Sequence, residues 1–286
     1  MSVMFAQSRI ATSAPFNKPV AGRQRAGQLW SSLADVCSLL GVTPTVAATA
    51  ADDVVFQHVQ FKAGQRLFTI GQPFDALYLV NSGFLKTVMI DDAGNEQVLS
   101  FPMKGDVLGV DGIHLKQYMS EAVALSSCDV VVIPFKVFSS LGRKYPELEL
   151  SLYGVLSREL TREHAMASAL GSLSAEARVG RFLVALSERY SAMGYSGKEF
   201  NLRMTRQEIG SYLGMTLETV SRTLSAFDRI GYIAVEGRSV TLKDMQALKT
   251  MRRLPPSQSR SKEVPSAKKL FTNFSFEAAE DVLAAV

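Results

Sequence analysis

Short apolar runs separated by turn-forming residues characterise the chain between Phe56 and Phe138. The turns are rich in Gly, Pro, Asn and Asp and fall at residues 62–64, 71–73, 81–83, 91–95 and 104–106. Short strands at this spacing are typical of a β-sandwich or barrel. The strongest hairpin signal is the Asp-Ala-Gly-Asn group between residues 85–90 and 96–101. A strand-rich module is therefore predicted.

A helical pattern begins at Pro146, and no further proline occurs before Gly171. Its seam repeats at spacings of three and four: Tyr153, Leu156, Leu160, Glu163, Ala167 and Leu170. A long helix over residues 146–171 is predicted, and its seam either pairs with a second copy or packs on its own domain. A second stripe favours pairing, because it is able to cover the strand-rich module and leave the seam free: Leu148, Leu152 and Val155.

Two helix starts follow each other closely after another amphipathic segment at 174–193. Thr205 and Glu208 form a capping box that starts the first helix. Gly214 is placed to end this helix, and Thr216 to cap the next one after a short turn. This spacing predicts a helix-turn-helix.

The second of these helices has an apolar face and a polar stripe. The apolar face is predicted to pack against Ile209 and Leu213 of the first helix: Leu217, Val220, Leu224 and Phe227. Glu218, Ser221 and Arg222 share the polar stripe near the helix start, where a DNA-reading helix meets base edges. Arg222 is suited to guanine and Glu218 to a cytosine amino group. The alternative is a weak surface ion pair between Glu218 and Arg222.

Residues 231–242 have the pattern of strand, Gly-containing turn and strand, so the helix-turn-helix is predicted to be winged. Five nearby side chains are predicted to contact DNA phosphates, which sets the register without reading sequence: Arg206, Thr216, Thr219, Ser225 and Arg238.

Composition places the 286-residue chain among globular proteins, with 47% hydrophobic and 20% charged residues. No apolar run approaches the roughly 20 residues of a membrane helix, and no secretory signal precedes residue 28. A cytoplasmic location and no membrane partner are expected. Residues 51–140 hold six basic and ten acidic residues, whereas 172–254 hold thirteen and eight. The basic excess slightly favours a nucleic-acid partner. An enzyme is not expected, because the sequence contains no P-loop, no catalytic triad and no metal-ligand spacing.

The segment MTRQEIGSYLGMTLETVSRTL at residues 204–224 resembles the CRP/FNR family of bacterial regulators, most closely its FNR branch. The Glu-x-x-Ser-Arg of the FNR reading helix matches Glu218, Ser221 and Arg222. The resemblance runs from about residue 28 to 250 and implies an α+β fold. Its parts would be a cyclic-nucleotide-binding-like β-roll, a long dimerisation helix and a C-terminal winged helix-turn-helix. It also implies a regulator that binds, as a homodimer, a palindrome close to TTGAT-N4-ATCAA, with RNA polymerase as downstream partner. Activator is the expected role, and the sequence leaves repression open.

The corresponding domains are expected at 28–145 for the sensory β-roll, 146–171 for the dimerisation helix and 172–254 for the winged helix-turn-helix. Residues 1–27 are expected to be a disordered tail, and 255–286 a second tail with a short helix over 276–286. A rival interpretation is an effector-binding protein, regulated by a cyclic nucleotide or another small molecule, whose helix-turn-helix serves protein contacts.

The residues that would sense a signal depart from the family pattern. In relatives that bind cyclic AMP, a Gly-Glu turn holds the ribose, whereas the turn here, Gly105–Gly109, has Asp106 after the glycine. No arginine lies between Arg66 and Arg143, so a cyclic phosphate has no bidentate partner in the β-roll. This argues against cyclic AMP.

The four thiolates of an FNR iron–sulfur cluster are also incomplete. Cys37 matches the last of the three N-terminal cysteines, but the other two positions are Gln28 and Ser31. The fourth position is Val131, three residues after Cys128. Such a cluster is therefore not expected.

Cys37 and Cys128 remain a candidate redox pair, and the alternative is two small apolar core residues. His58, His114 and His164 are candidate haem ligands, and the alternative for each is a structural role. The acidic Glu163 in the seam would meet its own copy in a dimer, where it opposes association unless it is protonated, moved aside or paired with Arg162.

Overall fold

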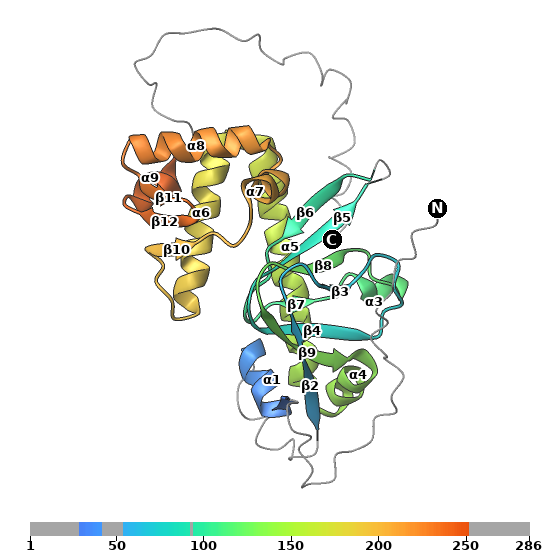
Figure 1. Ribbon diagram of the computed structural model, residues 1–286. Coiled ribbons are helices and arrows are strands. Elements are labelled where there is room, and N and C mark those ends of the chain that lie inside the picture. The colour runs from blue at the N-terminus through green and yellow to red at the C-terminus, as the bar shows by residue number, and fades with distance from the viewer. Residues whose placement is uncertain (1–28, 42–53, 92–93, 252–286) are drawn as a thin grey trace, which may run out of the picture. The chain divides into compact units, whose positions relative to one another are not determined.

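The computed structural model describes residues 29–41, 54–91 and 94–251, which belong to one compact unit of the chain. Both predicted tails, and the helix expected over 276–286, lie outside the described residues. Figure 1 labels the helices and strands in chain order.

The strand-rich part is a β-roll with short helices at its ends. Its elements are β1 (Trp30–Ser32), α1 (Leu33–Leu40), β2 (Val55–Phe61), β3 (Arg66–Phe68), β4 (Ala76–Ser82), β5 (Leu85–Ile90), β6 (Glu96–Ser100), β7 (Val107–Leu108), α3 (Gly112–Leu115), β8 (Glu121–Ala124), β9 (Cys128–Pro134) and α4 (Phe135–Lys144). One sheet has the order β1-β2-β9-β4-β7 and the other β3-β8-β5-β6. The neighbouring strands of both sheets pair antiparallel.

Two clusters of buried residues lie on opposite faces of the five-stranded sheet. Successive side chains of a strand point to opposite faces, and β4 supplies both clusters. Tyr78 and Val80 join the cluster shared with the four-stranded sheet. Leu77 and Leu79 join the cluster formed with α1 and α4. This central strand is therefore apolar at nearly every position, without the alternation of a half-exposed strand.

The second part of the chain is mainly helical. Its elements are α5 (Pro146–Ser172), α6 (Ala175–Ala192), β10 (Glu199–Asn201), α7 (Arg206–Leu213), α8 (Leu217–Arg229), β11 (Ile233–Glu236), β12 (Ser239–Leu242) and α9 (Met245–Thr250). The three strands form a small sheet in the order β10-β12-β11. The predicted α+β fold, with a β-roll, a long helix and a winged helix-turn-helix, is confirmed.

The helix α5 buries the stripe that was expected to face the β-roll. Leu148 is 1% exposed and Val155 8%, and Leu152 packs against the same cluster of buried residues. The seam lies on another side of the helix and is exposed. One face of α5 therefore belongs to the β-roll and another is free within a single chain.

The strand-rich module was predicted to run to Phe138, but residues 135–138 form the start of the helix α4. Sequence reasoning also missed α1, although Ser32 and Asp35 form a capping box there. The short strands β1 and β10 have three residues each, too few for a visible period. Among the described residues, no helix is both long and apolar enough to cross a membrane.

Candidate nucleic-acid interface

The capping box at the start of α7 is formed as expected. The Thr205 amide donates to the Glu208 carboxylate at 2.7 Å, and the Glu208 amide donates to the Thr205 hydroxyl at 3.2 Å. Gly214 ends the helix with a φ of 62°, in the left-handed region that glycine adopts without strain. These contacts fix the length of α7 to eight residues.

A second glycine, Gly210, allows the tight approach of the turn to α7. A Cβ atom at this position would lie 2.6 Å from the Met215 carbonyl oxygen, too close for any other residue without a shift of the backbone. The Met215 amide donates to the Gly210 carbonyl at 2.9 Å. Sequence reasoning did not single out Gly210, because its role depends on a contact with the turn that a helical pattern does not show.

The recognition helix α8 begins at the predicted cap. The Thr216 hydroxyl accepts a hydrogen bond from the Thr219 amide at 3.3 Å. Val220, Leu224 and Phe227 are buried as expected. The prediction for Leu217 was wrong: this side chain is 43% exposed, because the start of α8 approaches α7 at Gly210 through its backbone.

The polar stripe of α8 faces solvent. Glu218, Arg222 and Ser225 are exposed, and Ser221 is half-buried. Hydrogen bonds from its own backbone amide and from the Thr216 hydroxyl lower the pKa of Glu218, so it is an acceptor at neutral pH. The Arg222 guanidinium reaches the Thr219 hydroxyl at 3.5 Å. Within the described part of the chain Arg222 forms no ion pair with Glu218, so both remain available to a ligand.

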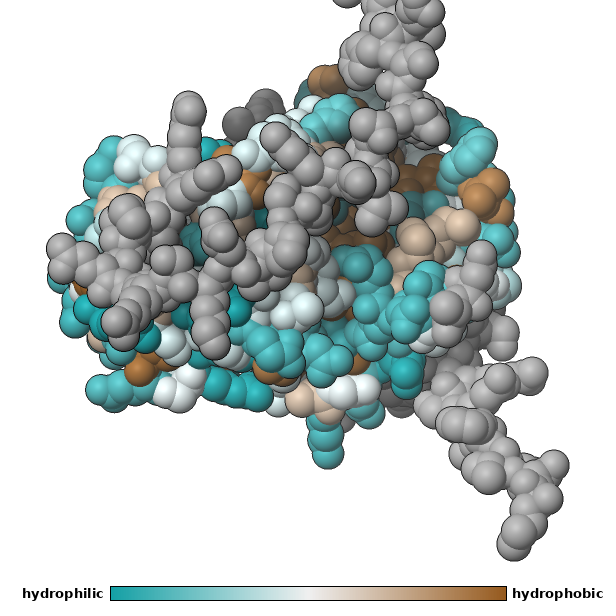
Figure 2. Space-filling view, turned by 90° about the horizontal axis from the view of Figure 1, so that it is seen from above, coloured by the Kyte–Doolittle hydropathy of each residue, from teal (hydrophilic) through white to brown (hydrophobic). Residues whose placement is uncertain are grey.

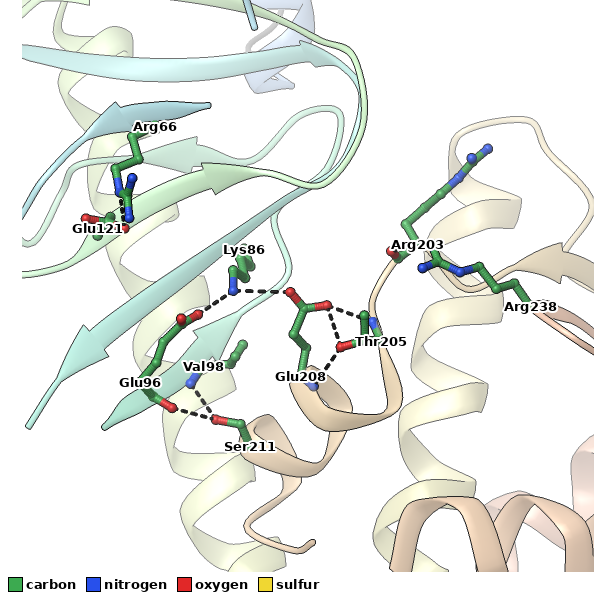
Figure 3. Close-up of polar contacts among 10 residues, drawn as sticks. All are labelled: Arg66, Lys86, Glu96, Val98, Glu121, Arg203, Thr205, Glu208, Ser211 and Arg238. Atoms are coloured by element: carbon green, nitrogen blue, oxygen red, sulfur yellow. Dashed lines mark hydrogen bonds and ion pairs between the residues drawn. The ribbon is translucent and has the colours of Figure 1, made fainter. Parts of the chain in front are cut away.

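The expected phosphate contacts lie around the stripe. Arg206 at the start of α7 donates to the Gly237 carbonyl in the wing at 3.1 Å. Partial burial and the charge of Arg238 lower the pKa of the Arg206 guanidinium. Arg238 reaches toward Arg203, whose carbonyl accepts at 3.4 Å (Figure 3). The positive charges of Arg206 and Arg238 thus lie close to each other, and such a pair favours an anion nearby.

A hollow of about 220 Å³ lies between α7, α8 and β11. It is lined by Arg206, Ser221, Leu224, Ser225, Asp228 and Val235. Figure 2 shows the molecule from the α8 side of Figure 1; where grey atoms do not cover this face, most residues are hydrophilic or neutral, and hydrophobic residues gather mainly on the right. The Thr216 hydroxyl caps α8 and also contacts the Thr219 hydroxyl at 3.2 Å, so both hydroxyls have partners within the chain.

The seam of α5 is exposed along its length in the single chain. The exposed fractions of Tyr153 and Leu160 are 53% and 54%, those of Leu156 and Leu170 are 38% and 45%, and Glu163 and Ala167 are exposed as well. Arg162 does not pair with Glu163. It forms ion pairs with Asp106 at 3.2 Å and Glu159 at 3.3 Å, because it points back to the β-roll.

The candidate sensory residues are not brought together. Cys37 lies in the buried cluster with α1 and Cys128 in the cluster between the sheets, and both are free thiols. Burial raises the pKa of both thiols, which disfavours the reactive thiolate. His58 uses one ring nitrogen with Ser31 and the other with Asp129, each at 2.7 Å.

Comparison with known proteins agrees with this architecture. Residues 58–145 match the model of the cyclic nucleotide-binding domain, and residues 177–251 that of the Crp-like helix-turn-helix domain. The transcriptional regulatory protein Btr of Bordetella pertussis is 40% identical, over 77% of this chain and 90% of that protein. The transcriptional activator protein Anr of Pseudomonas aeruginosa is 38% identical, over 74% of this chain and 87% of that protein.

A solved structure supports the same fold. FixK2 from Bradyrhizobium japonicum superposes with a TM-score of 0.64 at 24% identity, over 71% of this chain and 100% of that structure. The capped helix-turn-helix, its exposed polar stripe and these similarities lead to one assignment. The chain belongs to the CRP/FNR family of DNA-binding transcription regulators.

Proposed function

We propose that the protein acts as a homodimer on a palindrome close to TTGAT-N4-ATCAA, with one half-site for each subunit. The observation that carries this proposal is the solvent-facing stripe of Glu218, Ser221 and Arg222 at the capped start of α8. Arg222 would donate to guanine O6 and N7, and Glu218 would accept from a cytosine amino group. Arg206 and Arg238 would hold adjacent phosphates.

The exposed seam of α5 supports the homodimer. Four of its side chains are large and apolar and lie exposed in the single chain, while the neighbouring stripe of α5 packs on the β-roll. A second α5 is the partner that matches a heptad seam. Two copies of α8 would then be related by a two-fold axis, as a palindrome requires.

The residues present do not fit cyclic AMP. The cavity between the Gly105–Val107 turn and α5 has a volume of about 20 Å³, comparable to one water and far below a nucleotide. Although α5 supplies Arg158 and Arg162 to this cavity, Arg162 is already paired with Asp106. We therefore propose that the signal is not a cyclic nucleotide bound at this position.

The described residues do not fit a metal centre with three or more protein ligands either. No group of three or more His, Cys, Asp or Glu side chains suited to a metal occurs among them. With both ring nitrogens of His58 occupied, His114 and His164 are the remaining candidates for haem. We propose a regulator that holds no iron–sulfur cluster of the FNR type, and an iron analysis with an absorption spectrum of protein purified without oxygen tests this.

RNA polymerase is the proposed downstream partner, and activation the proposed effect. Support comes from the similarity to Anr, whose name describes a transcriptional activator. A cytoplasmic location follows from the same proposal, since the DNA is there.

The test is DNA binding by fluorescence anisotropy, with the palindrome and a scrambled duplex at one salt concentration, together with sedimentation velocity of the free protein. We expect a dimer that prefers the palindrome by about a thousandfold or more. Equal, salt-sensitive affinity for both duplexes would contradict base reading. A failure to bind either one would favour the rival, an effector-binding protein whose helix-turn-helix contacts other proteins.

A further inference from the structure

The first helix of the helix-turn-helix lies against the edge of the β-roll. β6 is the last strand of the four-stranded sheet, and its free edge faces α7 (Figure 3). We call the following residues the α7–β6 contact: Lys86, Glu96, Gln97 and Val98 on the β5–β6 hairpin, with Glu208 and Ser211 on α7.

Ser211 supplies the hydrogen bonds that a further strand would otherwise make. Its hydroxyl accepts from the Val98 amide at 2.8 Å and donates to the Glu96 carbonyl at 3.3 Å. The Gln97 side chain donates to the Ser211 carbonyl at 2.5 Å. Unpaired amides and carbonyls at a sheet edge are costly when covered without partners, so these bonds specify where on β6 the helix sits.

Lys86 adds an ion pair to the same contact. Its side chain is only 13% exposed and lies between the carboxylates of Glu96 and Glu208, the latter at 3.1 Å. Glu208 uses its second carboxylate oxygen for the Thr205 amide at 2.7 Å. One carboxylate therefore fixes the start of α7 and attaches it to the hairpin.

Neighbouring groups extend the contact toward α6. Arg189 of α6 donates to the Phe101 carbonyl at 3.0 Å and forms an ion pair with Asp106. The Phe101 ring packs against Tyr212 of α7 and Phe182 of α6, with ring centroids 5.3 and 6.1 Å away. The polar bonds at β6 thus border an aromatic cluster, which adds apolar packing to the same contact.

The reading stripe remains open while this contact is made. Glu218 and Arg222 are exposed in the structure that has the Lys86–Glu208 ion pair. The contact therefore does not cover the DNA-facing side of α8. It constrains orientation, because α8 packs directly on α7 through Val220 and Leu224.

We propose that Lys86 and Ser211 are positioning residues for DNA reading, which hold α7, and through it α8, at a fixed place on the β-roll. The proposal rests on the proposed function, in which two reading helices must meet half-sites at one spacing. Inserting one base pair between half-sites shifts the second by about 3.4 Å and rotates it by roughly 35°. A helix-turn-helix fixed to its β-roll rejects that change, whereas a loosened one tolerates it.

The experiment compares wild type with Lys86→Ala, Ser211→Ala and the conservative Lys86→Arg, and uses Lys62→Ala, an exposed lysine of the β-roll, as matched control. Hydrogen exchange at the Val98 amide reports the contact without DNA. Anisotropy with N4 and N5 palindromes reports spacing discrimination. Both alanine variants should speed Val98 exchange and lower N4-over-N5 discrimination, each by about tenfold. Lys86→Arg should retain most of both properties, and Lys62→Ala should match wild type.

Unchanged Val98 exchange and unchanged spacing discrimination in both alanine variants would overturn the proposal. Equal losses on the N4 and N5 duplexes would also overturn it, since they indicate general destabilisation and not lost positioning. If wild type prefers neither palindrome over scrambled DNA, the proposed function fails instead. In that case rapid Val98 exchange in wild type would show separately that the contact itself does not form.

Discussion

The reading stripe of α8 and the polar groups between the β-roll and its helices differ in how their charges are satisfied. Glu218 and Arg222 are exposed and form no ion pair with each other among the described residues. Lys86 and Asp106, in contrast, are nearly buried and each has two charged partners. The exposed groups of the stripe are therefore available to a ligand, whereas the paired groups stabilise the fold. Substitutions in the stripe should change binding without changing stability, whereas substitutions in the paired groups should lower stability and change DNA binding only through the position of α7 and α8.

The largest expected effect is on assembly, through the exposed apolar seam. Leu160→Glu places two carboxylates in the proposed dimer interface, where burial of unpaired charge costs several kcal/mol. The dimerisation constant should weaken by at least about a hundredfold, measured by sedimentation equilibrium. Leu115→Glu changes an equally exposed leucine of α3 and should leave assembly unchanged. An unaltered dimer in Leu160→Glu would remove the seam from the interface.

Glu163 offers a change of opposite sign at the same seam. Since Arg162 is paired elsewhere, two Glu163 carboxylates would repel each other across the two-fold axis. Glu163→Ala should strengthen dimerisation by about tenfold, and more at low salt. Glu147→Ala, at the exposed start of α5, is the control. If the dimerisation constant in sedimentation is the same with and without Glu163, the carboxylate does not make the dimer marginal.

A smaller effect is expected at the wing, where Arg238 is proposed to hold a phosphate. Arg238→Ala should weaken binding about fivefold on specific and scrambled DNA alike, and reduce the salt slope by about one. The melting temperature should not change, since its one hydrogen bond is weak. Arg143→Ala in the β-roll serves as the control. A loss confined to the palindrome would instead make Arg238 a base-reading residue.

The smallest effect concerns stability and its pH dependence at Lys86. Burial alone would lower the pKa of Lys86, but Glu96 and Glu208 outweigh it and raise the pKa. Hydrogen bonds from Thr205 and Lys86 likewise overcome burial and lower the pKa of Glu208. The ionised Glu208 contributes to the free energy of unfolding above its ordinary pKa of 4.5, and this contribution is lost as pH falls through the lowered pKa. The charged Lys86 contributes below its ordinary pKa of 10.5, and its contribution is lost as pH rises through the raised pKa.

Wild type should therefore exceed Lys86→Ala in stability by about 1 kcal/mol, a few degrees in Tm, at every pH between roughly 6 and 9. The difference should shrink as pH falls below 4.5 and vanish only below the lowered pKa of Glu208. Thermal unfolding followed by circular dichroism measures it. A difference that persists in acid would show that the lysine acts through packing and not through its charge.

The sequence was most informative where structure depends on near neighbours. The capping box of Thr205 and Glu208, the cap at Thr216 and the hairpin around residues 85–100 all involve contacts within a few residues, and all occur as expected. Leu217 was misplaced because helical periodicity does not show whether a residue approaches the neighbouring helix through its side chain or its backbone.

Contacts between distant segments were not predictable in this way. The bond from Val98 to Ser211 joins residues 113 positions apart, and Lys86 and Glu208 carry no pattern that connects them. The absence of arginine between Arg66 and Arg143 likewise did not show that α5 brings Arg158 and Arg162 to the Gly105–Val107 turn. Charge pairing across domains follows from the fold and not from local spacing.

Base reading by Arg222 is central to the proposed function, and a double-mutant cycle tests it directly. Wild type and Arg222→Ala are each titrated with the palindrome and with a duplex in which 7-deazaguanine replaces the half-site guanine, and Arg229→Ala is the control from the same helix. Each single change should cost about 1–3 kcal/mol, and the double change should cost no more than either alone. Additive losses, or an equal loss for Arg222→Ala on scrambled DNA, would show that Arg222 does not read this guanine.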